Sequence, residues 1–71
     1  MTLGEFIRKS RKAKRLTLQQ VAGLSGTSKS YIWELENGIS VNPGIMTSMY
    51  ICRALEVSIV DFGYASLGET P

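Results

Sequence analysis

Apolar residues recur along the chain at the three- and four-residue spacing of amphipathic helices, and this pattern predicts an all-α fold of five helices. The first predicted helix runs from Thr2 to Lys14. Its expected core side consists of Leu3, Phe6, Ile7, Ser10 and Ala13. Basic residues gather on another side, within an arc of about 100°, and these are Arg8, Arg11, Lys12 and Arg15. This basic stripe either meets a polyanion or is a solvated helix face.

A second, shorter helix is predicted after Thr17. Thr17 followed three residues later by Gln20 has the form of a capping box, in which each side chain bonds the other residue's backbone N–H. The apolar residues of this helix are Leu18, Val21, Ala22 and Leu24. In "LSGTS" the helical periodicity stops, and Gly26 can take the positive φ of a tight turn.

The third predicted helix runs from Lys29 to Glu36. Ser28 can cap its start, and Gly38 suits the left-handed position that follows a helix end. Successive residues of a helix are about 100° apart, so one side of it carries Lys29, Ser30, Trp33, Glu34 and Asn37. The core side carries Tyr31, Ile32 and Leu35. Trp33 is therefore expected to face outward, although a tryptophan can also fold over the edge of a core or lie in a dimer contact.

Two further helices complete the expected fold. Pro43 is predicted to start the fourth helix, and its buried stripe is expected to consist of Ile45, Met49, Cys52 and Leu55. Ser58 is predicted to cap a short fifth helix that contains Ile59, Val60 and Phe62. Residues 63–71 form a tail that either takes part in dimerisation or is disordered, within one domain of residues 1–71.

Residues of the second and third predicted helices satisfy the conditions for close packing of two helices joined by a turn. Ala22 is small enough for the crossing point, Gly26 suits the turn, and Ile32 returns an apolar side chain. With Val21 and Leu35 the set is typical of a helix-turn-helix, which presents its second helix to the major groove of DNA. An ordinary helical hairpin is the alternative interpretation.

Composition excludes several kinds of chemistry. The 71 residues include one cysteine and no histidine, which argues against a disulfide framework, a conventional zinc site and histidine-based catalysis. Cys52 is interpreted as a core thiol. No catalysis, cofactor, metal or small-molecule substrate is expected. The chain also lacks an apolar run of membrane-spanning length and a signal-peptide pattern at its start, so we expect a cytoplasmic protein with no membrane partner.

Charge is unevenly distributed along the chain. The formal net charge is +2, but residues 1–40 contain seven Lys and Arg against three Asp and Glu, whereas residues 41–71 contain one against three. This asymmetry is expected of a protein that meets a polyanion with one face.

The stretches "IRKSRKAKRLT", "QQVAGLSGTSKSYIWELENG" and "NPGIMTSMYICRALEVSIVDF" resemble the lambda-repressor-like, Cro-type (XRE-like) helix-turn-helix family, from about Leu3 to Phe62. The resemblance implies a compact five-helix DNA-binding domain in which the second and third helices form the helix-turn-helix. It also implies binding to double-stranded operator DNA, mostly as two-fold dimers. Most of the chain is covered by this resemblance.

The resemblance assigns roles to individual residues. The base-reading positions are Lys29, Ser30, Trp33 and Glu34. Lysine can donate to guanine, serine to a base or phosphate, and glutamate can accept from cytosine N4, while tryptophan can pack on a thymine methyl or a sugar. Glu34 could instead pair with Lys29 or Ser30. Arg11 and Glu36 match a structural ion pair of the family.

Phosphate contacts are implied for Thr17, Gln19, Thr27, Ser40 and Asn42. Three departures from the family pattern alter this expectation. Leu18 stands where the family frequently has glutamine, Arg15 where it often has glycine, and the loop after Gly38 is short of basic residues. We therefore expect phosphate binding to depend more on Lys12, Lys14 and Arg15.

The expected function is that of a sequence-specific transcriptional regulator, a repressor that binds a pseudo-palindromic operator as a homodimer. The expected dimer interface consists of Ile59, Val60, Phe62, Tyr64 and Leu67, since these apolar residues are too numerous for an isolated short terminus. The alternative is a helix-turn-helix module, such as an antitoxin or adaptor, whose main partner is a protein.

Overall fold

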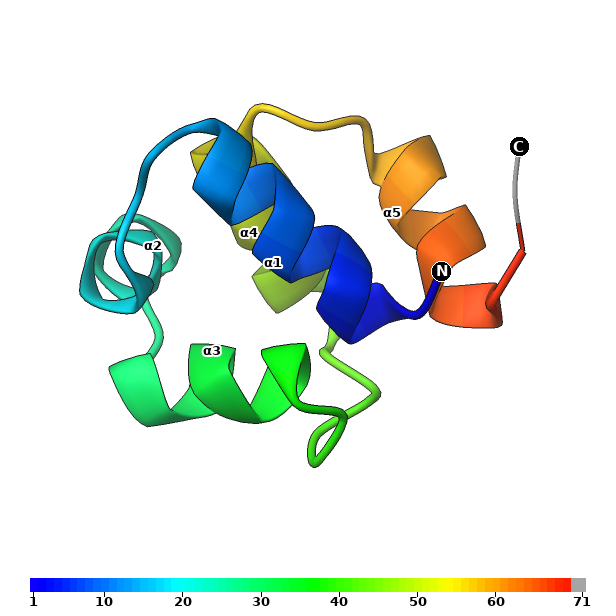
Figure 1. Cartoon of the computed structure of the whole chain (residues 1–71), viewed down its shortest axis with the longest axis horizontal. Coiled ribbons are helices and arrows are strands. Elements are labelled where there is room, and N and C mark those ends of the chain that lie inside the picture. The colour runs from blue at the N-terminus through cyan, green and yellow to red at the C-terminus, as the bar shows by residue number, and fades with distance from the viewer. Residues whose placement is uncertain (70–71) are drawn as a thin grey trace.

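A computed structural model describes residues 1–69 of the chain, and it contains the five helices that the periodicity predicts. In chain order they are α1 (Leu3–Ala13), α2 (Leu18–Ser25), α3 (Lys29–Glu36), α4 (Ile45–Leu55) and α5 (Ile59–Leu67). The described residues contain no strand, so the prediction of an all-α fold is confirmed. Figure 1 shows α1 across the middle of the molecule, with α2 and α5 on opposite sides of it and α3 along one edge.

Local capping chemistry explains where the helices begin. At α2, Gln20 N–H donates to Thr17 Oγ1 over 3.1 Å and Thr17 N–H donates to Gln20 Oε1 over 2.8 Å, which is the predicted capping box. Ser28 and Ser58 cap α3 and α5 as predicted. A second capping box, between Thr2 and Glu5 at the start of α1, was not predicted.

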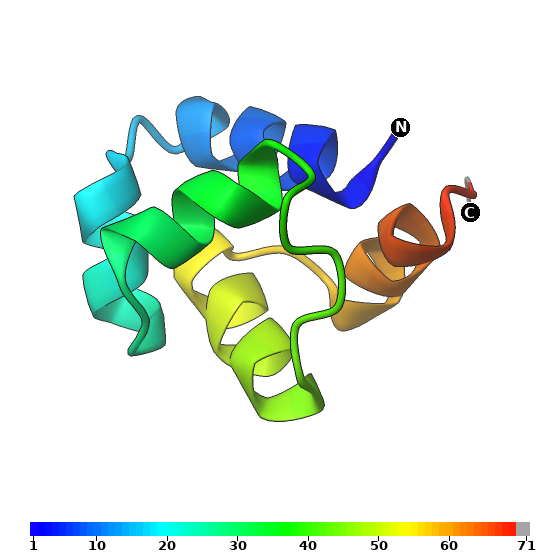
Figure 2. The same cartoon turned by 90° about the horizontal axis from the view of Figure 1, so that it is seen from below.

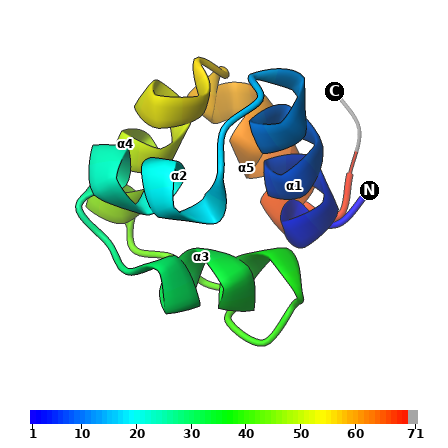
Figure 3. The ribbon, with the colours of Figure 1, turned by 60° about the vertical axis from the view of Figure 1, so that its left-hand side comes forward.

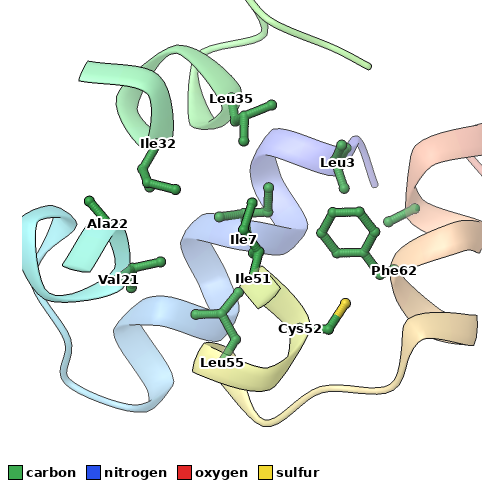
Figure 4. Packing of buried hydrophobic residues seen from close by; sticks show 11 residues of the cluster. Leu3, Ile7, Val21, Ala22, Ile32, Leu35, Ile51, Cys52, Leu55 and Phe62 are labelled. Atoms are coloured by element: carbon green, nitrogen blue, oxygen red, sulfur yellow. The ribbon is translucent and has the colours of Figure 1, made fainter. Parts of the chain in front are cut away.

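Eleven buried apolar residues, contributed by all five helices, form the core. Figure 4 shows Ile32 and Leu35 of α3 pointing toward Ile7 of α1, with Ile51 and Leu55 of α4 beyond. The side chains of this core supply most of the driving force for folding, because burial of apolar surface is favourable in proportion to the area removed from water. The core therefore fixes which side of α3 faces inward.

Close contact with α1 holds the C-terminal end of α3. A Cβ atom added to Gly4 would lie 2.5 Å from the carbonyl oxygen of Glu36, a separation that real Cβ atoms do not show. Gly4 is thus the residue that lets α1 and α3 approach each other. In Figures 1 and 3, α3 lies at the edge of the molecule and no helix covers its outer side.

The predicted buried stripe of α4 is wrong in its first half. Ile45 is 69% exposed and Met49 is 51% exposed, and the buried residues are instead Ser48, Ile51, Cys52 and Leu55. Gly44 is the N-cap, so Pro43 precedes the helix rather than starting it. Figure 2 shows the first turn of α4 projecting past the other helices. The apolar residues of that turn therefore reach no core within the protomer.

The fifth helix is longer than predicted. It continues to Leu67, so the first five residues of the expected tail are helical, and Gly68 ends it with a φ of 72°. Residues 70–71 of that tail lie outside the described residues. Core placement was also wrong for Ala13, which is exposed, and Leu24 of α2 faces solvent as well. No helix within residues 1–69 combines the length and the hydropathy needed to cross a bilayer.

Candidate nucleic-acid interface

The two sides of α3 differ sharply in exposure. Ile32 and Leu35 are completely or almost completely buried, whereas Lys29, Ser30 and Trp33 are exposed. Lys29, Ser30, Trp33 and Glu34 together line one depression on the molecular surface. We call these four residues the outer edge of α3. The outer edge combines an ammonium group, a hydroxyl, an indole and a carboxylate, which can donate to, accept from and stack against other groups.

Trp33 points away from the core and is 48% exposed. The Asn37 amide nitrogen donates to the Trp33 carbonyl oxygen over 2.8 Å, which closes the end of the helix beneath it. The indole is not among the partly buried residues that pack against the core. A tryptophan folded over the core edge is therefore excluded for this protomer, and its exposed face can contact another molecule.

Glu34 is held by the loop that follows α3. Ser40 Oγ donates to Glu34 Oε1 over 3.0 Å, and the Ile39 and Ser40 N–H groups donate to the Glu34 carbonyl oxygen over 2.9 Å and 3.2 Å. Neither Lys29 nor Ser30 bonds the Glu34 carboxylate within residues 1–69, so the pairing considered for it from the sequence is wrong. Ser40, expected to contact phosphate, instead directs its hydroxyl proton to Glu34.

A second depression lies beside the start of α3, where the connection between α1 and α2 comes close to Lys29. Its lining includes Arg15, Thr17, Gln19 and Lys29. Thr17 Oγ1 accepts the Gln20 N–H in the capping box, which leaves the threonine hydroxyl proton free to donate. Three residues with expected phosphate contacts are thereby brought next to one expected base-reading residue.

Arg15 occupies this depression in a left-handed backbone conformation, with a φ of 57°. It follows the end of α1, where Leu16 N–H donates to the Arg11 carbonyl oxygen over 3.1 Å. Glycine usually takes this position because it has no Cβ to clash. An arginine in this position therefore adds a positive charge here and strains the backbone.

The other residues that were expected to contact phosphate lie apart from one another in the structure. Lys14 forms an ion pair with Glu56, which ties the end of α1 to the end of α4. Thr27 Oγ1 lies 3.2 Å from Ser25 Oγ. Lys12 and Asn42 are exposed, and Asn42 lines a separate groove formed mostly by apolar residues. Of the residues expected to contact phosphate, Arg15, Thr17 and Gln19 line a depression together with Lys29.

The structure contains the ion pair between Arg11 and Glu36. Arg11 Nε lies 2.6 Å from Glu36 Oε2, and Arg11 Nη2 donates to Glu36 Oε1 over 3.1 Å. The hydrogen bond to Glu36 raises the pKa of the Arg11 guanidinium above its ordinary value. The Glu36 side chain is only 2% exposed, so its charge requires these partners.

Arg8 is a further partner of Glu36 that the sequence analysis did not identify. Its Nε lies 3.3 Å from Glu36 Oε1, and its Nη2 donates to Asn37 Oδ1 over 3.3 Å. The available signal was its spacing, since Arg8 precedes Arg11 by three residues and shares its helix side. Two of the four residues of the predicted basic stripe, Arg8 and Arg11, thus bind side chains at the C-terminal end of α3.

The expected dimer interface needs one correction. Phe62 is 2% exposed, and its ring meets that of Phe6 edge-on at 6.2 Å between centroids, so it belongs to the core of the protomer. Ile59, Val60 and Leu67 are exposed, and Tyr64 is half-buried. Ile59 also shares a groove with Val41, Pro43 and Ile45, which sequence reasoning had not connected with it. We call the exposed side chains of Val41, Ile45 and Ile59, which line this groove, the apolar edge.

The connected pair α2 and α3, with a glycine turn between them and the outer side of α3 uncovered, defines a helix-turn-helix domain. Gly26 has a φ of 70°, and Thr27 N–H donates to the Ala22 carbonyl oxygen over 2.9 Å, which closes the turn. The chain belongs to the helix-turn-helix domain family, whose model matches residues 2–62.

Proteins similar to this chain are named as regulators or controllers. The chain is 36% identical over 59 residues to the HTH-type transcriptional regulator SlrR from Bacillus subtilis, covering 83% of this chain and 39% of SlrR. It resembles the restriction-modification controller protein C.AhdI from Aeromonas hydrophila with a TM-score of 0.79 and 28% identity, over 84% of this chain and 89% of C.AhdI. A structure of SinR, the master regulator for biofilm formation, in complex with DNA matches with a TM-score of 0.81 and 30% identity, over 86% of this chain and 97% of the chain in that structure.

Among residues 1–69, no three His, Cys, Asp or Glu side chains come together as they would to hold a metal ion. Cys52 is buried, and this burial raises the pKa of its thiol above the ordinary value.

Proposed function

We propose that this chain is the DNA-binding domain of a transcriptional regulator that recognises a specific duplex sequence by inserting α3 into the major groove. The observation that carries the proposal is the outer edge of α3: its four side chains have base-reading chemistry, three of them are exposed and Glu34 is half-buried, and the opposite side of the helix is buried in the core. The resemblance to SinR, which was solved in complex with DNA, supports it.

Lys29, Ser30, Trp33 and Glu34 read base edges in this proposal. Lys29 donates to guanine O6 or N7, Ser30 donates to or accepts from a base or phosphate, and Glu34 accepts from cytosine N4. Trp33 packs its indole on a thymine methyl or a deoxyribose. Since one base contact of good geometry is worth about 1–3 kcal/mol of discrimination, two or three of them suffice to separate an operator from random sequence.

Phosphates on one strand occupy the depression that Arg15, Thr17 and Gln19 line beside Lys29. These contacts fix the register of α3 in the groove, because phosphate contacts position a protein on DNA without reading its sequence. Lys12 adds positive charge on α1, and Thr27 and Asn42 contribute backbone or side-chain donors to phosphates elsewhere along the duplex. Lys14 contributes less, because Glu56 neutralises it.

The regulator acts as a homodimer on a pseudo-palindromic operator, and it represses by occupying DNA that the transcription machinery needs. The apolar edge supports self-association, since exposed apolar groups that lie together favour burial against another surface. Two-fold symmetry is the commonest arrangement of protein dimers, and it places the two half-sites one helical turn apart, about 34 Å.

Selection of bound sites from a random duplex pool tests the proposal. We expect an enriched motif with two inverted half-sites whose centres lie about 10 base pairs apart, and an affinity that falls steeply as salt rises from low to moderate concentration. Equal affinity for all duplexes would contradict sequence-specific recognition. An enriched motif without inverted repeats would contradict the dimer but not the base reading.

A protein-binding module, such as an antitoxin or adaptor, is the second candidate function. The exposed indole of Trp33 and the apolar edge favour it, because aromatic residues are enriched at the centres of protein interfaces. The two functions respond differently to salt. Counterion release makes DNA binding salt-dependent, whereas an apolar protein contact responds little.

A further inference from the structure

Ser40 and Glu34 are joined through both backbone and side chain. The Ser40 N–H donates to the Glu34 carbonyl oxygen over 3.2 Å, and the Ser40 hydroxyl donates to Glu34 Oε1 over 3.0 Å. Gly38, with a φ of 73°, lets the chain turn back after α3 so that Ser40 reaches the helix it has just left. The loop therefore holds one specific side chain of the outer edge.

The side-chain hydrogen bond restricts the Glu34 carboxylate. A glutamate on a helix surface otherwise samples many rotamers, and ordering it costs free energy when it binds. With Oε1 engaged by Ser40, Oε2 keeps its lone pairs for a donor on another molecule. The carboxylate is thus oriented in the free protein, before any partner arrives.

A serine hydroxyl has a single proton, and in this structure that proton goes to Glu34. It is then not available for a phosphate oxygen, which also needs a donor. The two roles exclude each other in the observed geometry. The negative charge of Glu34 adds a second reason, because a carboxylate beside Ser40 repels a phosphate at the same place.

We infer that Ser40 is a positioning residue for base reading: it holds the Glu34 carboxylate in the orientation that accepts from a cytosine amino group. This inference rests on the proposed function and adds a residue that increases the sequence specificity of base reading. An unheld carboxylate near the phosphates of DNA is pushed away from them toward solvent, whereas a held one stays directed into the groove. Ser40 therefore acts on sequence preference without touching DNA.

Binding-site selection and competition binding with Ser40→Ala, Ser40→Thr and Glu34→Ala test this role. Glu34→Ala identifies the base pair whose preference depends on the carboxylate. At that pair, Ser40→Ala should reduce the preference by about three- to tenfold, part of the discrimination that one base contact provides. Ser40→Thr keeps a hydroxyl and should retain the preference. Asn42→Ala, in the same exposed loop, should lower affinity for all duplexes alike and leave every preference unchanged.

Two results would overturn the inference. Ser40→Ala could lower affinity equally for all duplexes, as the loss of a phosphate contact would, or it could leave binding unchanged. Wild-type protein that shows no sequence preference would overturn the proposed function itself, and this outcome is visible before any variant is compared. Thermal unfolding of Ser40→Ala, expected within a few degrees of wild type because the hydroxyl is in a surface loop, excludes misfolding as the cause.

Discussion

Helices α3 and α4 both place one side on the same core, but they differ in what holds them and in what they leave outside. α3 is held at its C-terminal end by α1, through the close approach at Gly4 and the two arginines on Glu36. The first turn of α4 carries Ile45 and extends past the core. Apart from Trp33, α3 thus leaves a mainly polar side exposed, whereas the first turn of α4 leaves apolar surface uncovered.

The difference indicates two kinds of partner. The outer edge of α3 is polar apart from Trp33, and it suits the hydrated, hydrogen-bonding DNA groove that we propose as its partner. The apolar edge beside α4 gains free energy from any surface that removes it from water, and a second copy of the chain offers the same surface in return. Separate substitutions can test the contacts that hold α3 against α1 and the role of the apolar edge in self-association.

The largest effect on the free energy of unfolding is expected from breaking the ion pair between Arg11 and Glu36, which holds α3 against α1. Arg11→Ala leaves the buried Glu36 with only the partly exposed Arg8, and it should lower the free energy of unfolding by about 3 kcal/mol. The control is Arg8→Ala, which should cost under about 1 kcal/mol because Arg8 is 44% exposed. Urea denaturation measures both. An Arg11→Ala variant as stable as wild type would show that Glu36 does not need this partner.

Gly4→Ala tests the contact between α1 and α3 by adding one methyl group. Because that methyl would collide with the Glu36 backbone, we expect a loss of about 2 kcal/mol. Gly23→Ala is the matched control inside α2, where nothing lies within 4 Å of the added Cβ. It should stabilise the protein by about 0.5–1 kcal/mol through helix propensity. Equal effects of the two alanines on denaturant midpoints would contradict a special approach at Gly4.

Ile59→Asp tests whether the apolar edge joins two protomers. A charge at this half-exposed position should raise the dimer dissociation constant at least about tenfold, since burying an isoleucine side chain is worth about 1.5–3 kcal/mol. Sedimentation equilibrium measures the change. Leu24→Asp, on the exposed side of α2, is the control and should leave association intact. If both variants associate as the wild type does, the interface lies elsewhere.

The smallest change in stability is expected at Arg15. Its replacement by glycine should change stability and DNA binding in opposite directions. Arg15→Gly should stabilise the fold by at most about 1 kcal/mol. Glycine removes the strain of the left-handed backbone conformation, but it also has greater conformational freedom in the unfolded chain, which offsets part of this gain. It should also weaken binding to all duplexes and reduce the salt slope by about 1.

Glu56→Gly is the matched control for Arg15→Gly. Glu56 has a φ of 56° at the end of α4, so its replacement relieves the same kind of strain. It removes no positive charge, and duplex affinity should not fall. Weakened binding in both variants, or in neither, would argue against a phosphate at Arg15.

Local rules account for what the sequence predicted well. Capping boxes, helix-ending glycines and 3.6-residue spacing depend on neighbours a few residues apart, and they located α2, the turn at Gly26 and the two sides of α3. They do not say how far a helix extends beyond its core. For that reason Ile45 and Met49 were assigned to the wrong environment, and Phe62 was placed in an interface instead of against Phe6.

Within the candidate site, the exposure of side chains was easier to predict from the sequence than their hydrogen-bond and ion-pair partners. The exposure of Lys29, Ser30 and Trp33 follows from helical geometry alone. The bond from Ser40 to Glu34 depends on how the chain turns after Gly38, and the pairing of Lys14 with Glu56 depends on where α4 ends. Both diverted residues that had been expected to contact phosphate.

The most direct test of the account compares wild-type protein with a Lys29→Ala, Ser30→Ala double variant on the selected duplex and on random DNA. Both side chains are exposed, so the free energy of unfolding should stay within about 0.5 kcal/mol of wild type. The ratio of specific to random affinity should fall at least about tenfold, since each lost base contact is worth about 1–3 kcal/mol. Full discrimination in the double variant would show that the outer edge of α3 does not read DNA.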